Sequence, residues 1–127
     1  MTRVVVTAAV IERDGRFLIT KRQAGVHLAG IWEFPGGKCL PGESLDSCMA
    51  RELLEELAVV AAVGREIFTT THEYPERIVE LHFFQCEISG EPTPQQGQAM
   101  RWVPRAELAT LEFPPADVEL IVRLSNA

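Results

Sequence analysis

The sequence of 127 residues is short of positive charge: 12 lysines and arginines stand against 18 aspartates and glutamates, which gives a formal net charge of −6. Because domains that bind nucleic-acid duplexes are usually basic, this balance argues against DNA or RNA as the main partner. Small phosphorylated ligands remain compatible with it, since metal ions can bring them to an acidic site. No apolar run approaches the roughly 18 residues needed to span a bilayer, so we expect no membrane partner.

Cysteine is also scarce. Cys39, Cys48 and Cys86 are odd in number and form no C-x-x-C pair, so the sequence suggests neither a zinc site nor a disulfide framework. We expect three free thiols that behave as small, partly buried hydrophobic residues in a reducing cytoplasm. The apolar stretch from Val4 to Ile11 has no small-residue cleavage site after it, so we expect a buried strand there and not an export signal.

Apolar residues make up 46% of the chain, which is enough to bury a core, and the length predicts a single domain over residues 1–127. Strands are expected at residues 3–12, 16–22, 31–34, 63–71, 78–88 and 100–103, and helices at residues 44–57, 104–108 and 116–124. Asp14-Gly15 predicts a hairpin turn between the first two strands. Residues 23–30, 35–42 and 90–97 are expected to be loops. This order predicts a mixed α/β (α+β) domain.

The helix expected at residues 44–57 is the clearest element. Ser44 can cap its N-terminus, with Ser47 as an alternative start. At 100° per residue, one apolar stripe should face the core. Its members are Met49, Ala50, Leu53, Leu54 and Leu57. The helix is expected to end near Ala58.

Three glutamates share another face of this helix. Glu52, Glu55 and Glu56 stand at positions i, i+3 and i+4, where like charges repel by a few tenths of a kcal/mol per pair, an effect that Arg51 can partly offset through Glu55. A solvated acidic face explains such a pattern, and so does a site for a hard divalent cation such as Mg²⁺. The residues around the cluster decide between these two interpretations.

Those residues resemble the Nudix box of the nucleoside-diphosphate-linked hydrolases, which reads Gly, five residues, Glu, seven residues, Arg-Glu-apolar-x-Glu-Glu-x-Gly-apolar. The matching positions are Gly37, Glu43, Arg51, Glu52, Leu53, Glu55, Glu56 and Val59. Six matches of charged residues or glycine at fixed spacing arise by chance at roughly 10⁻⁷ per start position. Ala58 stands where the family has glycine. A left-handed cap there costs a non-glycine residue on the order of 1 kcal/mol.

The resemblance implies the Nudix fold, a mixed β-sheet sandwiched between helices, and a hydrolase that uses Mg²⁺, with Mn²⁺ as a substitute. It implies that the carboxylates Glu52, Glu55 and Glu56 and the Gly36 carbonyl bind the metal. Glu52 is the leading candidate for the general base, and Arg51 belongs to the catalytic group. Gly37 leaves room in the loop. Glu43, together with Arg51, is expected to hold that loop against the helix.

Further segments resemble the MutT branch of the family, whose members sanitise nucleoside triphosphate pools and so support DNA replication and repair. These segments are residues 32–38, 71–75, 81–84, 102–103 and 113–117. The resemblance suggests substrate contacts from Arg22, Phe34, Lys38, Arg77 and Asp117. Each has a plainer alternative. Phe34 can be a core aromatic, Lys38 an exposed lysine, the two arginines surface ion-pair partners, and Asp117 a helix N-cap. His27 is expected to be a solvated loop histidine.

The substrate stays open between two bases. MutT enzymes that act on 8-oxo-dGTP commonly carry Asn where Asp117 stands. An ionised Asp only accepts hydrogen bonds, which suits an edge of guanine or cytosine that presents donors, while a protonated Asp restores a donor. Oxidised guanine nucleotides are the leading substrates, and (d)CTP or modified cytidine triphosphates are the alternative.

A second departure from MutT is Gln96, which stands near a loop glutamate that serves as an additional metal ligand or base. We expect this ligand to be missing or replaced by Glu43. A non-catalytic nucleotide-binding Nudix module is therefore the alternative from another functional class. The MutT resemblance also suggests a monomer, with a dimer as the alternative.

Overall fold

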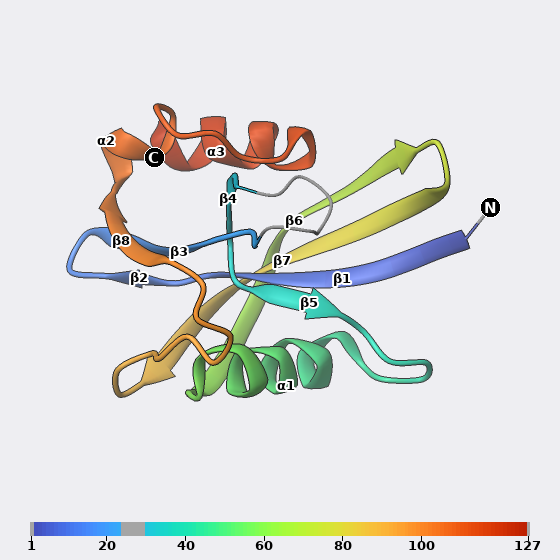
Figure 1. Ribbon diagram of the computed structural model, residues 1–127, viewed down its shortest axis with the longest axis horizontal. Helices are drawn as coiled ribbons and strands as arrows, with labels where there is room; N and C mark the ends of the chain where they lie inside the picture. The colour runs from blue at the N-terminus through green and yellow to red at the C-terminus, as the bar shows by residue number, and fades with distance from the viewer. Residues whose placement is uncertain (1, 24–29, 127) are drawn as a thin grey trace.

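The structure is a computed structural model that describes residues 2–23 and 30–126 (Figure 1). In chain order its strands and helices are β1 (Thr2–Val10), β2 (Glu12–Arg13), β3 (Arg16–Lys21), β4 (Trp32–Glu33), β5 (Gly36–Lys38), α1 (Leu45–Leu57), β6 (Val60–Tyr74), β7 (Arg77–Ser89), β8 (Met100–Pro104), α2 (Arg105–Leu108), the 3-10 turn η1 (Pro115–Asp117) and α3 (Val118–Ser125). Among the described residues, no helix is long and apolar enough to cross a membrane.

The strands form two sheets between helices. The first sheet has the order β5-β1-β7-β6, and it is mixed because β1 runs parallel to β7 and antiparallel to β5. In the second sheet, β3 pairs with β2, β4 and β8. Helix α1 lies on one side of the sheets, and α2 and α3 lie on the other (Figure 1). The expected mixed sheet between helices is confirmed.

Alternation along the central strands divides the core into two layers. On the α3 side of the sheets, the core contains the strand residues Ala8, Val10, Phe17, Ile19 and Phe83 and the α3 residues Leu120 and Ile121. On the α1 side, it contains Ala9, Ile11, Leu18 and Phe84 from the strands and the connection between β1 and β2, and the α1 residues Met49, Leu53 and Leu57. Because both faces of β1 and β3 are covered, these strands read as continuous apolar runs in the sequence.

Helix α1 begins as predicted, with the Ser44 hydroxyl accepting a hydrogen bond from the Ser47 amide at 3.2 Å. It ends at Ala58, which adopts the left-handed conformation with φ 55° and donates its amide hydrogen to the Leu54 carbonyl at 3.0 Å. The left-handed cap therefore forms without glycine. The prediction that Leu54 faces the core is wrong, since its exposed fraction is 55%. The stripe of Met49, Leu53 and Leu57 is narrower than expected and leaves Leu54 on its edge.

The prediction of a loop over residues 35–42 is wrong in part, because Gly36–Lys38 form β5 against β1. A Cβ atom on Gly36 would lie 1.9 Å from the Thr7 carbonyl oxygen. The glycine thus allows two backbones to approach closely, whereas the Pro-Gly-Gly run resembles a break. The strand expected at residues 3–12 is interrupted at Ile11, which separates β1 from β2. The Asp14-Gly15 turn between β2 and β3 is confirmed.

The hairpin of β6 and β7 is longer than the predicted strands at residues 63–71 and 78–88. It extends to the pair Tyr74 and Arg77, so a two-residue turn closes it. Irregular register between Val63 and Phe68 interrupts the alternation that would reveal β6 in the sequence. The extension matters because it carries Tyr74 and Arg77 to the cavity described below.

The prediction that all three cysteines are free is wrong for two of them. Cys39 and Cys48 form a disulfide, while Cys86 is free and buried. The Cα atoms of the bonded pair are 5.2 Å apart, within the usual range for a disulfide. Spacing alone could not show this proximity, because it arises from the return of the chain after β5 onto the first turn of α1. The disulfide also removes the free-thiol argument for a reducing compartment.

Candidate active site

Arg51 is the centre of a hydrogen-bond network between α1 and the loop before it. Its Nε and Nη2 atoms donate to the two oxygens of Glu43 at 2.7 and 2.9 Å. Its Nη1 atom donates to Glu55 at 2.8 Å and to Glu52 at 3.0 Å. Nη2 also donates to the Lys38 carbonyl at 3.0 Å. One guanidinium thus connects the end of β5, the loop and two carboxylates of α1.

Glu43 is committed to this network. Hydrogen bonds from Arg51 and from the Leu40 amide, the latter at 2.9 Å, lower the pKa of Glu43 to about 2. Both of its oxygens therefore accept hydrogen bonds from the protein itself. This geometry fits the predicted bracing of the loop better than the alternative in which Glu43 supplies a further metal ligand.

Strand β5 lies directly against the Glu52 carboxylate. A Cβ atom on Gly37 would lie 2.2 Å from Glu52 Oε2, so only glycine leaves this carboxylate in place. Burial raises the pKa of Glu52, and the hydrogen bond and charge of Arg51 oppose that rise. A carboxylate whose pKa is raised is a stronger base in its ionised form.

Glu56 faces β5 and the cavity. One of its oxygens accepts a hydrogen bond from the Gly36 amide at 3.3 Å. Burial raises the pKa of Glu56 to about 7, with the nearby charge of Glu33 as the next cause. In addition, Gln98 donates a side-chain hydrogen bond that opposes this rise.

The predicted donor set has the chemistry of a site for a hard divalent cation, although in this structure Glu52, Glu55 and Glu56 do not form a ready-made group of ligand atoms. Glu52, Glu55 and Glu56 offer carboxylate oxygens from one helical face, and oxygen is the ligand that Mg²⁺ prefers. Burial raises the pKa values of Glu52 and Glu56, which disfavours their ionised forms. A bound cation would supply the missing positive charge. Glu55 is more exposed than the other two and is held by Arg51.

A cavity of about 480 Å³ opens beside Glu56, which is within the size range of small-molecule sites. All five predicted substrate-contacting residues line it, as do both glycines of the box. These lining residues are Arg22, Phe34, Lys38, Arg77, Asp117, Gly36 and Gly37. The structure therefore joins residues that follow β3 and β4, residues of β5 and β7, and the last residue of η1 in one cavity with a carboxylate of the box.

The structure bears on the alternative roles of Asp117 as a helix N-cap and of Phe34 as a core aromatic residue. Asp117 occupies the N-cap position of α3, but its side chain makes no capping hydrogen bond. It is 3% exposed, and burial, together with the charge of Glu33, raises its pKa to about 7. Phe34 both lines the cavity and belongs to the core, where its ring stacks on Phe113 with centroids 5.4 Å apart.

Sequence reasoning missed Glu33 and Tyr74, which also line the cavity. Glu33 pairs with Arg22 at 2.7 Å, and burial raises its pKa against the opposing charge of Arg22. The sequence signal for Glu33 was its position as a charged residue inside the short apolar stretch at residues 31–34. Gln96 lines the same cavity. His27 lies outside the described residues.

Comparisons with known proteins agree with this geometry. The sequence-family model of the NUDIX domain matches residues 6–123 of this chain. The chain is 38% identical to the CTP pyrophosphohydrolase of Escherichia coli K12, over 95% of this chain and 90% of that protein. It is 37% identical to the 8-oxo-dGTP diphosphatase of Haemophilus influenzae, again over 95% and 90% of the two chains.

Solved structures give the same result. The solution structure of the E. coli ORF135 protein matches with a TM-score of 0.85 and 37% identity, over 96% of this chain and 88% of that one. The MutT protein of Methanosarcina mazei matches with a TM-score of 0.88 and 25% identity, over 98% and 94% of the chains. Proteins of this family generally use a divalent metal ion and act on small nucleotides. The chain belongs to the Nudix family and is a hydrolase of the MutT type.

Proposed function

We propose that this protein is a Mg²⁺-dependent pyrophosphohydrolase that cleaves a nucleoside triphosphate to the monophosphate and pyrophosphate, with oxidised guanine nucleotides such as 8-oxo-dGTP as its leading substrates. The observation that carries the proposal is the shared cavity. It brings Glu56 of the box together with the buried Asp117 and with four cationic side chains, those of Lys21, Arg22, Lys38 and Arg77. The cell would use such an activity, in a single domain, to sanitise its nucleotide pool.

The metal would be held by the carboxylates of Glu52, Glu55 and Glu56 and by the Gly36 carbonyl. When bound, Mg²⁺ supplies Lewis acidity that makes water more acidic and neutralises charge on phosphate oxygens. Mn²⁺, which takes the same oxygen ligands, would substitute. The net charge of −6 makes the cation necessary for triphosphate binding as well as for the reaction.

The chain itself positions the groups that act on the substrate. Glu52 accepts the proton of the attacking water, and Arg51 holds the Glu52 carboxylate in place through the 3.0 Å hydrogen bond. Lys38, Arg22 and Arg77 line the cavity and would present positive charge to the phosphates and the sugar. Asp117, buried at the N-cap position of α3, reads the base.

A second candidate substrate is a cytidine triphosphate. The relative with 38% identity is named a CTP pyrophosphohydrolase, and relatives with 37% and 32% identity are named 8-oxo-dGTP diphosphatases. An ionised Asp117 would accept a hydrogen bond from the cytosine amino group. The identity values are too close to separate the two substrates.

The test is pyrophosphate release from 8-oxo-dGTP, dGTP, CTP and dCTP, each with and without Mg²⁺. We expect metal-dependent release with the highest kcat/KM for 8-oxo-dGTP. Preference for CTP or dCTP would keep the reaction and replace the substrate. Nucleotide binding without release from any of the four would overturn the proposal.

Two variants accompany this panel. Glu52→Gln removes the proton acceptor and should lower kcat by about 10² to 10⁴-fold. Glu119→Gln changes an exposed glutamate of α3 that forms an ion pair with Arg123 at 2.7 Å. Glu119 is not among the described residues that line the cavity, so this variant should leave kcat unchanged. Unchanged turnover in the Glu52 variant would contradict the assigned role.

A further inference from the structure

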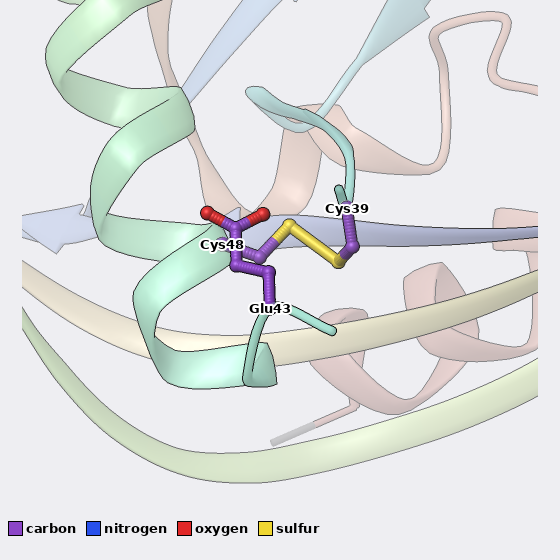
Figure 2. Close-up of side chains that lie close together, drawn as sticks. All are labelled: Cys39, Glu43 and Cys48. Atoms are coloured by element: carbon purple, nitrogen blue, oxygen red, sulfur yellow. A yellow bond between two sulfur atoms is a disulfide. The ribbon is translucent and has the colours of Figure 1, made fainter. Parts of the chain in front are cut away.

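The disulfide between Cys39 and Cys48 joins the two elements that build the proposed metal site (Figure 2). Cys39 directly follows β5, the strand that lies against Glu52 and Glu56. Cys48 lies in the first turns of α1, the helix that carries those glutamates. The proposed hydrolysis uses neither cysteine.

The bond closes a ring of chain that contains Glu43. The Glu43 carboxylate and the two sulfur atoms lie within 4.8 Å of one another, and Figure 2 shows the Glu43 side chain beside the sulfur pair. Glu43 holds Arg51 through two hydrogen bonds, and Arg51 in turn holds Glu52. The disulfide therefore limits the movement of the loop on which this chain of contacts depends.

Cys48 also contacts β5 and β1. Its sulfur lies 4.0 Å from the Gly37 carbonyl and 3.3 Å from the Thr7 hydroxyl. Gly37 is the residue whose missing side chain makes room for the Glu52 carboxylate. The Cys48 sulfur therefore lies close to the backbone that is directly beside a proposed metal ligand.

We propose that Cys39 and Cys48 form a redox-modification site, a reversible dithiol–disulfide pair whose closed form fixes the loop against α1 and preorganises the metal-binding carboxylates. Opening the pair releases the loop that carries Glu43 and weakens metal binding. The effect on metal binding rests on the proposed metal site. The effect on turnover rests on the proposed function.

Access differs between the two sulfur atoms, and this sets the course of the reaction. Cys39 is partly exposed, whereas Cys48 is 0% exposed. A reducing dithiol attacks Cys39 Sγ as its thiolate, which breaks the S–S bond, forms a mixed disulfide and releases the Cys48 thiolate, which takes up a proton. The second thiolate of the reductant then releases Cys39 and leaves the reductant as a cyclic disulfide.

The disulfide forms again when hydrogen peroxide acts as the oxidant. The Cys39 thiolate attacks one oxygen of hydrogen peroxide, which forms the sulfenic acid and releases hydroxide. The Cys48 thiol then attacks the Cys39 sulfur, and water leaves as the disulfide forms. The two thiols lose two electrons in total, and the O–O bond accepts them.

A metal ion held by the same three side chains is the competing explanation. Two thiolates and a carboxylate within 4.8 Å could bind a soft cation such as Zn²⁺. However, Glu43 already accepts hydrogen bonds from Arg51 and from the Leu40 amide, and the two sulfur atoms are bonded to each other. The contacts therefore favour the redox pair.

The test compares the whole protein after treatment with hydrogen peroxide and after treatment with dithiothreitol. Alkylation and mass spectrometry count free thiols, and Mn²⁺ affinity is measured by electron paramagnetic resonance, which needs no turnover. We expect one free thiol, that of Cys86, in the oxidised protein and three in the reduced protein. Reduction should weaken Mn²⁺ binding roughly tenfold, the lower end of effects from groups that support metal ligands.

Variants separate the pair from the third cysteine. Cys39→Ser should hold the Mn²⁺ affinity at the reduced value under both treatments, and Cys48→Ala provides a second variant of the same bond. Cys86→Ala should respond to the treatments as the unmodified protein does. Three free thiols after peroxide, equal Mn²⁺ affinity in both states, or stoichiometric Zn²⁺ retained by the reduced protein would each overturn the proposal.

The same measurements distinguish the two proposals of function and regulation. If neither redox form releases pyrophosphate but the Mn²⁺ affinity still follows the thiol count, the redox site stands and the proposed hydrolysis fails. If both forms release pyrophosphate at equal rates with equal Mn²⁺ affinity, the hydrolysis stands and the redox site fails.

Discussion

At the scale of single residues, Asp117 is the side chain whose protonation bears most directly on substrate choice. It is buried in the cavity, makes no capping hydrogen bond and has a pKa raised to about 7, first by burial and then by Glu33. Below that pH the carboxylic acid can both donate and accept a hydrogen bond, as an asparagine amide does. Above it the carboxylate only accepts.

We therefore expect the base preference to change with pH. An oxidised guanine presents a carbonyl acceptor beside an N–H donor, which suits the protonated form, whereas the cytosine amino group suits the ionised form. The ratio of kcat/KM for 8-oxo-dGTP to that for CTP should fall about tenfold from about pH 6 to about pH 8. Asp117→Asn should keep the ratio high and remove its pH dependence, as steady-state kinetics at several pH values will show.

The control for this prediction is Glu112→Gln, which changes an exposed glutamate close to Asp117 in the chain. It should show the same pH profile as the unmodified protein. If Asp117→Asn kept the pH dependence of the kcat/KM ratio, another group would be responsible for the change in base preference. Glu33, whose charge affects Asp117, would be the first candidate.

Residues of this kind differ in how well the sequence predicts them. The placement of Glu52, Glu55 and Glu56 on one helix could be predicted, because the helical repeat converts their spacing into a shared face, while their role as metal ligands stays a prediction. Asp117 and Arg77 needed the MutT resemblance, since nothing local distinguishes them from surface residues. Glu33 could not be assigned from the sequence, because its importance depends on the cavity that surrounds it.

At the scale of elements, β5 shows how two neighbouring glycines can serve different purposes. A Cβ atom on Gly36 would meet the backbone of Thr7 at 1.9 Å, whereas one on Gly37 would meet the movable end of the Glu52 side chain at 2.2 Å. The first contact concerns the pairing of two strands, and the second concerns the placement of a proposed catalytic carboxylate.

Substitution of these glycines should separate stability from activity. Gly36→Ala must displace β5 from β1, so we expect the free energy of unfolding to fall by roughly 2 to 3 kcal/mol. Gly37→Ala should change stability much less, but a displacement of Glu52 by about 1 Å can cost on the order of 10²-fold in kcat. Urea unfolding and pyrophosphate release measure the two effects. Similar losses of stability in both variants would contradict this distinction.

The end of α1 offers a second prediction at this scale. Ala58 adopts a φ of 55°, a left-handed conformation that is unfavourable for a residue with a Cβ atom. Ala58→Gly should therefore raise the free energy of unfolding by about 0.5 to 1 kcal/mol in urea titrations, after allowance for the greater entropy of glycine in the unfolded chain.

Ala50→Gly is the matched control, because Ala50 lies inside the same helix with ordinary helical geometry. There the change should lower the free energy of unfolding by about 1 kcal/mol. A loss of stability in both variants would show that the cap is held by contacts that glycine weakens.

The elements that the sequence predicted best are those with a strong local signal. Helix α1 has a cap and a period, and the β2–β3 turn has Asp14-Gly15. Strand β5 and the disulfide were missed because both depend on a chain return that brings residues 36–39 against β1 and α1. Their signals in the sequence, a glycine pair and two widely spaced cysteines, are typical of loops and free thiols.

At the scale of the whole molecule, ionisable groups at the cavity and on the β6–β7 hairpin make stability depend on pH. His82 links the hairpin strands, with its two ring nitrogens 2.8 Å from Glu66 and 2.6 Å from Glu80. Burial alone would lower the pKa of His82, but the hydrogen bonds to Glu66 and Glu80 together raise it above 6.5. Stability from its protonated form is fully present below about pH 6.5 and is lost as the pH rises through the folded-state pKa.

Glu56 and Asp117 act in the same direction. Their pKa values of about 7 lie above the ordinary values of 4.5 and 3.8, so the folded protein binds more protons than the unfolded chain between those limits. In that window the free energy of unfolding falls as the pH rises. The metal-free protein should therefore be most stable at mildly acidic pH, and the cation should be most useful where the carboxylates are ionised.

Thermal unfolding at several pH values, in EDTA and in Mg²⁺, tests this argument. In EDTA we expect Tm to fall by at least about 5 °C from about pH 5.5 to about pH 8. Mg²⁺ should raise Tm more at the higher pH, because it binds the ionised Glu56 in competition with protons. Glu56→Gln should flatten the pH dependence of Tm in EDTA and reduce the increase of Tm in Mg²⁺. His82→Gln should remove the contribution of His82 to the pH dependence of Tm and leave the increase in Mg²⁺ unchanged. A Tm that rose with pH in EDTA would mean that the buried carboxylates ionise without cost, and the case for a cation at this face of α1 would then rest on the sequence pattern alone.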